Sequence, residues 1–222
     1  MAVHYRTPSF ILSKDDFQEA DQVFSIYTKE FGKLKVLGKS IRKIKSKLRS
    51  GIAPFYLSEI EFIQGRNYKT LTDAVLIKKY ELCDLDKLGT GCRIAKVADD
   101  LIKGQENDEG IWDLLCESFE KLDSKIIYHY FLWNLLSLLG YQIDLYNCAH
   151  CQNKLLPNKL YFEEGIVCCK QGKEISPEVI KILRLILKKD PILEKLKLEE
   201  YMEELEQVSQ DYLANIQNIC NN

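Results

Sequence analysis

"QVFSIYTKEFGKLKVLGKSI", residues 22–41, is the stretch that decides how the first part of this chain folds. It contains two segments, 22–28 and 33–41, in which apolar and polar side chains alternate, with Gly32 between them. Such alternation is typical of a half-buried β-strand, because successive side chains point to opposite faces of a sheet. The stretch therefore predicts two strands joined by a turn, with Lys33, Lys35 and Lys39 on one face.

Three more segments of β character flank this stretch, at residues 10–13, 55–63 and 69–77. The last two are separated by the turn-forming sequence QGRN at 64–67. Five strands with short links are typical of a small closed or partly closed barrel. We therefore expect a five-stranded barrel domain at residues 1–78.

After about residue 79 the spacing of apolar residues changes from two to nearly four, which indicates helices. Residues 124–141 are apolar almost all round and should form a buried central helix. Ser176 is a good N-cap for a helix that starts with Pro177, and Pro191 should interrupt that helical run. The final helix carries one apolar stripe at steps of three and four: Tyr201, Leu205, Val208, Tyr212, Ile216 and Ile219.

The predicted fold class is therefore α+β, with the β part first. The second domain, residues 79–222, is a helical bundle with a cysteine-containing insertion at about 146–173. We find no internal repeat and no low-complexity linker between the two domains.

Composition describes an ordinary globular protein of 222 residues, with 46% hydrophobic and 29% charged residues. No run of 18 uncharged apolar residues is present, and the N-terminus lacks the apolar core of a secretory signal, so we expect a cytoplasmic protein. The eight cysteines then favour free thiols and metal ligands over disulfides. Four lie among apolar helical residues and are expected to be small buried hydrophobes: Cys83, Cys92, Cys116 and Cys220.

The net charge of −2 conceals an asymmetry. Residues 29–49 contain nine basic residues and one acidic residue, whereas residues 194–211 contain seven acidic residues and two lysines. The basic groups of the first stretch could follow a phosphate backbone, with Phe31, Phe55 and Tyr56 as surfaces for base stacking. Alternatively, the same run is a solvated charged hairpin without a ligand.

A second constellation is "NCAHCQNKLLPNKLYFEEGIVCCKQG", residues 147–172. Cys148 and Cys151 have the spacing of a metal-binding knuckle, and Cys168 follows at the distance expected for a zinc site. The usual spacing would place the fourth ligand at Gln171, a poor ligand for zinc. Cys169, His150 or a water could replace it, and Cys168 and Cys169 could share one ion only if the chain turns sharply between them. The alternative is a metal-free loop with vestigial cysteines.

Catalytic motifs are absent from the sequence: there is no nucleotide-binding glycine loop, no nucleophile elbow and no H-E-x-x-H. Asp99 and Asp100 are expected at a turn or helix end. Glu163 and Glu164 are expected to be solvated turn residues, and His129 a satisfied core histidine. We expect no enzymatic activity.

Taken together, these residues resemble the RecO family of bacterial DNA repair proteins, which act as recombination mediators. The resemblance covers most of the chain: "YRTPSFILS" as first strand, "EADQVFSIYTKEFGKLKVLGKSIRKIKSKL", "PFYLSEIEFIQGRNYKTLTDA", "LLSLLGYQIDLYNCAHC" and "YFEEGIVC". It departs from the family pattern at the second cysteine pair, which has no intervening residues. The order and spacing of these pieces carry the resemblance, because each piece alone is weak.

The resemblance implies an N-terminal oligonucleotide/oligosaccharide-binding (OB) barrel and a helical domain with a zinc-ribbon-like insertion. It also implies binding of single- and double-stranded DNA and annealing of complementary strands. The implied partners are RecR and single-strand binding protein, with RecF in some species, and the implied role is to help load RecA. The expected location is the cytoplasm, near the nucleoid. The metal ligands would be Cys148, Cys151 and Cys168, with Cys169 or none as the fourth, and the metal a structural Zn²⁺. The residues that would contact DNA are Lys33, Lys35, Lys39, Arg42, Lys43, Lys45, Lys47 and Arg49.

The acidic, hydrophobic tail of single-strand binding protein would need an apolar pocket rimmed by basic groups. Lys181, Arg184, Lys188 and Lys189 offer such charge, although they are equally plain helix-surface residues. The alternative function is a zinc-stapled interaction adaptor that does not bind DNA, and a third class is a zinc-dependent nuclease or nucleotidyl transferase.

Overall fold

The computed structural model describes residues 3–65, 68–80, 82, 84–155, 160–163, 165–170 and 172–221, without the side chains of 219–221. Some of the expectations fall outside these residues. They concern Cys83, Glu164 and Gln171, the side chains of Ile219 and Cys220, and half of the turn at 64–67. The chain divides into two compact units, Met1–Asp123 and Ser124–Asn222. No helix in the described ranges combines the length and the apolar character needed to span a membrane.

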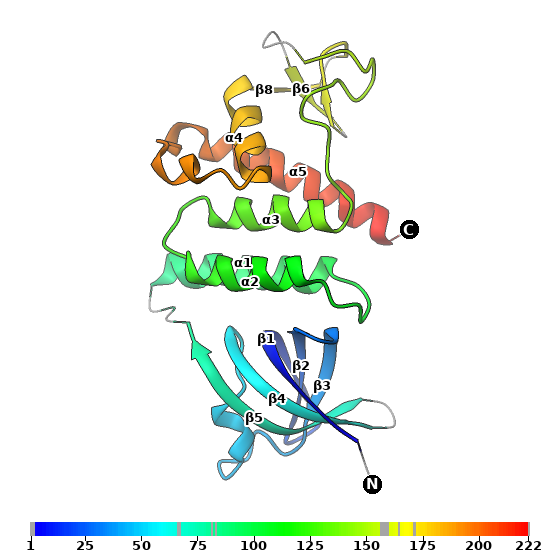
Figure 1. Ribbon diagram of the computed structural model, residues 1–222, viewed down its shortest axis with the longest axis vertical. Coiled ribbons are helices and arrows are strands. Elements are labelled where there is room, and N and C mark those ends of the chain that lie inside the picture. The colour runs from blue at the N-terminus through cyan, green and yellow to red at the C-terminus, as the bar shows by residue number, and fades with distance from the viewer. Residues whose placement is uncertain are drawn as a thin grey trace. The chain divides into compact units, whose positions relative to one another are not determined.

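Five strands at the start of the chain close into a barrel in the order β1-β2-β3-β5-β4 (Figure 1). They are β1 (His4–Phe17), β2 (Asp21–Thr28), β3 (Gly32–Gly38), β4 (Tyr56–Gln64) and β5 (Lys69–Lys79). Every pairing is antiparallel except the short parallel pairing of β3 with β5, where Val36 faces Lys69. A five-stranded barrel closed in this way is an OB-fold, as expected from the sequence.

The barrel interior is filled by the apolar side chains of the alternating segments. On β3, Leu34 and Val36 are buried whereas Lys35 is exposed, which is the pattern that the sequence predicted. The barrel core consists of Ile11, Phe24, Ile26, Leu34, Val36, Ile41, Ile52, Ile60, Phe62, Leu71 and Ala74.

Two helices belong to the same compact unit as the barrel. Helix α1 (Leu85–Leu101) begins at the N-cap Asp84, and α2 (Glu109–Glu120) begins at the N-cap Asp108. The phenol of Tyr27 on β2 donates a hydrogen bond to the backbone carbonyl of Asp108, at 3.1 Å. We expected a domain boundary at 78/79. Strand β5 ends at Lys79, and the compact unit continues to Asp123 because α1 and α2 contact the barrel.

The second unit is built around α3 (Ile127–Leu138), in which residues 127–136 are all buried, as expected for a central helix. Against it lie α4 (Pro177–Leu187) and α5 (Met202–Asn221). The indole of Trp133 stacks on Tyr212 at a centroid distance of 5.2 Å. The short 3₁₀ helices η2 (Pro191–Lys195) and η3 (Glu199–Tyr201) connect α4 to α5.

Several local expectations for this unit are confirmed. Ser176 caps α4, because its hydroxyl accepts a hydrogen bond from the Val179 N–H. His129 is a satisfied core histidine, 2% exposed, whose Nδ1 lies 3.0 Å from the hydroxyl of Ser209. The apolar stripe of α5 is buried at Leu205, Val208, Tyr212 and Ile216, but Tyr201 lies in η3, before α5 begins.

A small three-stranded sheet, in the order β7-β6-β8, interrupts the helices of the second unit. Its strands are β6 (Leu160–Phe162), β7 (Ile166–Val167) and β8 (Lys173–Ile175). This is the position of the expected insertion. The expectation for the scattered cysteines is wrong at Cys92, which is exposed on α1, and Cys116 on α2 is only half-buried.

Candidate functional site

Residues 39–49, here called the basic loop, leave β3 and lead into the 3₁₀ helix η1 (Lys47–Ser50). The loop is tied to the turn between β1 and β2: the Ser40 N–H donates to the Asp21 carboxylate at 2.7 Å, and the Arg42 N–H to the Ala20 carbonyl at 3.0 Å. Ile41 is 1% exposed and belongs to the barrel core. Burial of this side chain fixes the loop on the barrel and leaves the charged side chains on the outside.

The cationic side chains of the basic loop are exposed to solvent. Arg42 forms an ion pair with Asp16, at 3.3 Å. Within the described part of the chain, no carboxylate forms an ion pair with the other five, which are Lys39, Lys43, Lys45, Lys47 and Arg49. The loop therefore presents a concentrated positive charge that acidic neighbours hardly offset.

Lys33 does not belong to this exposed set. Its side chain is 14% exposed, and its ammonium group lies 2.8 Å from the carboxylate of Asp99 in the last turn of α1. It also donates to the Asp99 carbonyl and, at 3.2 Å, to the Ile102 carbonyl. We therefore remove Lys33 from the candidate DNA-contacting residues, whereas Lys35, two residues further on, is exposed.

Asp99 is the common hydrogen-bond acceptor of a polar cluster that was not predicted from the sequence. Its carboxylate accepts hydrogen bonds from the hydroxyls of Ser13, at 2.9 Å, and Ser25, at 2.6 Å. Burial raises the pKa of this carboxyl, but the hydrogen bonds from Lys33, Ser25 and Ser13 outweigh that effect, so the pKa lies below its ordinary value. The helix-end expectation for Asp99 holds, and its role is to tie α1 to β1, β2 and β3.

The three aromatic residues expected to stack bases are engaged within the protein. Phe31 and Tyr56 pack against the barrel core. Phe55 stacks on Phe119 of α2 at a centroid distance of 5.9 Å. Each of the three is half-buried and in contact with other side chains, so none is a freestanding aromatic surface.

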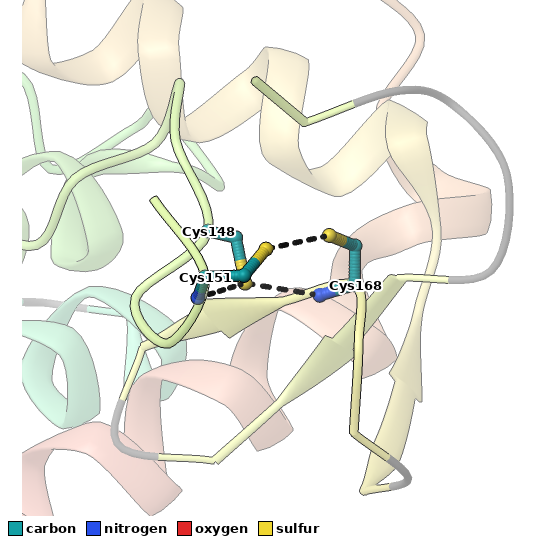
Figure 2. Close-up of side chains that lie close together, drawn as sticks. All are labelled: Cys148, Cys151 and Cys168. Atoms are coloured by element: carbon teal, nitrogen blue, oxygen red, sulfur yellow. Dashed lines mark hydrogen bonds between the residues drawn. The ribbon is translucent and has the colours of Figure 1, made fainter. Parts of the chain in front are cut away.

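The cysteine stretch brings three thiols together, as Figure 2 shows. The sulfur atoms of Cys148, Cys151 and Cys168 all lie within 4.8 Å of one another. Cys148 and Cys151 come from the knuckle at the end of the long connection from α3, and Cys168 follows β7 directly. These three residues, here called the cysteine cluster, are close enough to hold one metal ion.

Backbone N–H groups point at the buried sulfur of the cluster. The N–H of Cys151 lies 3.5 Å from the Cys148 sulfur, and that of Cys168 lies 3.4 Å from it, as the dashed lines in Figure 2 mark. Burial raises the pKa of the Cys148 thiol, but these hydrogen bonds outweigh it and lower the pKa to about 5. A thiolate at this position is the form that binds metal.

Cys169 lies beside the cluster but is not among the thiols that all lie within 4.8 Å of one another. Its sulfur lies 3.8 Å from that of Cys148, while the Cys151 and Cys168 sulfurs are 3.7 Å apart. Four thiolates at about 2.3 Å from a tetrahedral metal are roughly 3.8 Å from one another. The chain bends at 168–170, after β7 ends, which is the sharp turn that two adjacent ligands require. Nδ1 of His150 is 3.4 Å from the Cys169 sulfur, so it is the competing ligand.

Two of the four basic residues that the sequence suggested for a partner pocket, Arg184 and Lys188, lie beside a hollow. A hollow of about 590 Å³, here called the tyrosine hollow, lies in the second unit between α4 and the segment 142–146. Arg184 and Lys188 line it, and their charged groups lie 4.5 and 5.9 Å from the ring centre of Tyr146. Lys181 instead forms an ion pair with Glu178, at 3.6 Å.

Comparison with known proteins agrees with the two-part organisation of the chain. Residues 1–80 match the family model "Recombination protein O N terminal", and residues 82–215 match "Recombination protein O C terminal". The chain is 30% identical to the DNA repair protein RecO of Dehalococcoides mccartyi over 218 residues, which cover 91% of this chain and 86% of that protein. It is 27% identical to the DNA repair protein RecO of a Thermoanaerobacter species, with 96% and 98% covered.

A third relative, the DNA repair protein RecO of Thermodesulfovibrio yellowstonii, is 27% identical, with 96% of this chain and 94% of the relative covered. These matches span both compact units, including the barrel and the cysteine insertion. The chain therefore belongs to the RecO family, whose members take part in DNA repair and recombination.

Proposed function

We propose that this protein is a non-enzymatic mediator of recombinational repair that binds DNA, anneals complementary single strands and helps to load the RecA recombinase. The observation that carries the proposal is the basic loop, with five exposed cations that have no ion-pair partner among the described residues. Its place on an OB-fold supports a nucleic-acid ligand, because this barrel commonly binds oligonucleotides.

The proposed mechanism is electrostatic. Two complementary strands repel each other through their phosphates, and bound lysines and arginines reduce that repulsion while releasing counterions. Contacts to phosphates leave the base edges free to pair, since they carry no sequence information. The basic loop would therefore hold strands of any sequence close enough for pairing to begin.

For the cysteine cluster we propose a structural Zn²⁺, because thiolate ligands at tetrahedral spacing suit this ion. Cys148, Cys151 and Cys168 would hold it, with Cys169 as the fourth ligand. A bound zinc ion would stabilise the insertion, whose sheet has only two or three residues in each strand.

For the tyrosine hollow we propose the acidic, hydrophobic tail of single-strand binding protein as the occupant. Arg184 and Lys188 supply charge, and Leu145, Tyr146 and Leu187 supply apolar surface. The one acidic residue of the lining, Asp144, is held by the N–H groups of Tyr146 and Asn147 at 2.7 and 3.0 Å. RecR, and RecF where it participates, are proposed as further partners on family grounds.

The competing proposal is an interaction adaptor that does not bind DNA. Mobility shift with single-stranded oligonucleotides separates the two. We expect binding at low salt, with log K falling at a slope of about −4 against log salt if about six phosphates are engaged. Annealing of complementary strands coated with single-strand binding protein should be accelerated. Absence of binding at low salt would leave the adaptor, and cleavage or joining of labelled DNA with Mg²⁺ or Zn²⁺ would contradict the non-enzymatic assignment.

A further inference from the structure

The first unit has a second positively charged feature, separate in sequence from the basic loop. It is a hollow of about 610 Å³, here called the lysine hollow, formed by three segments far apart in the chain. These are the outer face of β3 at Lys35, Tyr68 just before β5 with Lys69 at its start, and the loop after α1 at Lys103 and Gln105. Such a volume is within the range of small-ligand sites and can accommodate a nucleotide.

The walls of the lysine hollow are held together by specific contacts. Lys69 donates a hydrogen bond to the side-chain oxygen of Gln105, at 3.2 Å, which joins β5 to the loop after α1. Gly32 has a φ of +60°, and a Cβ added there would lie 2.3 Å from the Glu106 carbonyl oxygen. The loop after α1 therefore lies directly against the start of β3, in an approach that only glycine permits. The hollow is thus preformed.

The charge of the lysine hollow is unbalanced. Among the described residues that line it, four are lysines and none is acidic. Lys33 is neutralised by Asp99, which leaves the charges of Lys35, Lys69 and Lys103. Lys35 and Lys103 are exposed, and within the described ranges neither forms an ion pair. Three cations around one concave site favour an anionic ligand that carries more than one charge.

An aromatic ring stands in the same site. Tyr68 is 36% exposed, and the edge contact with Phe17, at a centroid distance of 5.6 Å, supports it. This is a different situation from Phe31 and Tyr56, which pack on the barrel core. A supported, accessible ring beside cations is the combination by which single-stranded nucleic acids are bound, since the ring stacks a base and the cations hold the backbone.

The lysine hollow and the basic loop meet the same turn of the barrel, between β1 and β2. Phe17, at the end of β1, contacts Tyr68 in the hollow. Ala20, three residues later, accepts the backbone hydrogen bond from Arg42 of the basic loop. One strand of nucleic acid can therefore touch both features by passing this turn.

We propose that the lysine hollow holds one nucleotide segment of the single-stranded DNA that the basic loop binds, an inference that rests on the proposed function. Lys35, Lys69 and Lys103 hold its phosphates, and Tyr68 stacks on a base. In a duplex the bases are stacked on each other, so Tyr68 contributes to the binding of single strands only. The hollow thus makes the surface prefer the unpaired substrate of annealing.

The test measures binding of a fluorescent oligothymidylate and of a duplex of equal length, by anisotropy at several salt concentrations. Tyr68→Ala should weaken single-strand binding by about 5- to 150-fold, the range for one stacked base, and leave duplex binding unchanged. Tyr68→Phe, which keeps the ring, should bind like the wild type. The triple variant Lys35→Gln, Lys69→Gln, Lys103→Gln should make the single-strand salt slope shallower by about 2, at roughly 0.7 per phosphate contact.

The matched control for the triple variant is Lys14→Gln, Lys79→Gln, Lys96→Gln, which removes the same charge from exposed lysines elsewhere in this unit. Photo-cross-linking of an oligonucleotide that contains 5-iododeoxyuridine should label the wild-type protein at Tyr68. This inference alone would be overturned if Tyr68→Ala and the triple lysine variant bound single strands as well as the control variant does. Cross-links confined to the basic loop would also overturn it. Absence of wild-type binding at low salt would overturn the proposed function together with it.

Discussion

Lys33 and Asp99 form an ion pair of 2.8 Å that joins the start of β3 to the last turn of α1. Sequence places Lys33 in the basic run of residues 29–49, yet its ammonium group is turned toward a carboxylate 66 residues away. The same strand face thus carries a structural lysine at 33 and an exposed one at 35. The difference between them can be measured.

Removal of one partner of this pair should destabilise the first unit. Lys33→Met leaves the Asp99 carboxylate half-buried without its cation, and we expect a loss of about 1–3 kcal/mol in the free energy of unfolding. Lys35→Met, on the same face of the same strand, should change it by less than about 0.5 kcal/mol. Urea denaturation followed by circular dichroism measures both. Equal effects of the two substitutions would show that the ion pair contributes no stability.

The Asp99 carboxyl should also make stability depend on pH. Its pKa is 3.8 in the unfolded chain and lower in the folded protein, so between these values the unfolded chain binds more protons and stability rises with pH. The contribution should be fully present above about pH 5 and lost as the pH falls through the folded pKa. The difference in unfolding free energy between wild type and Asp99→Asn should therefore shrink below that pH. A difference that stays constant down to pH 2 would contradict the lowered pKa.

Charge reversal in the basic loop should abolish strand annealing. The triple variant Arg42→Glu, Lys43→Glu, Lys45→Glu replaces attraction for phosphates by repulsion, while Ile41 and the loop's anchoring backbone bonds are retained. A variant with Lys14, Lys79 and Lys96 changed to Glu has the same net charge and should retain most of the annealing rate. The rate is measured with complementary labelled strands, and helical content by circular dichroism. Wild-type annealing by the loop variant would show that the loop is not the binding surface.

One metal ion per chain should be found in the purified protein and should be lost with Cys148→Ser, because that buried thiol is central to the cluster. Cys169→Ser should weaken zinc binding more than His150→Ala does, since the Cys169 sulfur stands at tetrahedral distance from Cys148. Cys116→Ser, which removes a thiol outside the cluster, is the control. Elemental analysis and competition with a zinc-binding dye give stoichiometry and affinity. A greater loss with His150→Ala would assign the fourth position to the histidine.

The tyrosine hollow should bind a peptide with the acidic, hydrophobic C-terminal sequence of single-strand binding protein. Lys188→Glu should weaken this binding by about tenfold or more, because a repulsive charge replaces an attractive one at the rim. Lys181→Glu, on the same helix but outside the lining of the hollow, should have little effect. Isothermal titration measures both affinities. Equal losses in the two variants would indicate only a general charge effect of α4.

Much of the fold was predictable because its signals are local. Alternation in residues 22–28 and 33–41 identifies β2 and β3, since burial of Leu34 and Val36 dictates the face that points inward. Ser176 and Pro177 mark the start of α4 for an equally local reason, the unpaired N–H groups of the first turn. Spacing within residues 148–169 likewise identified the cysteine cluster, because a knuckle and a following cysteine are close in the chain.

The tertiary structure decided which of the charged and aromatic side chains are free. Lys33 is ion-paired, Phe31 packs on the core and Cys92 is exposed, and the few residues on either side of each give no sign of this. The lysine hollow could not be predicted at all, because β3, β5 and the loop after α1 bring its lysines together from three separate regions. Sequence by itself determined the elements, the barrel and the clustering of the thiols, since these follow from periodicity and short spacing. Which cations remain available to a ligand follows from long-range packing, because only the folded chain brings an acidic partner such as Asp99 next to a lysine such as Lys33.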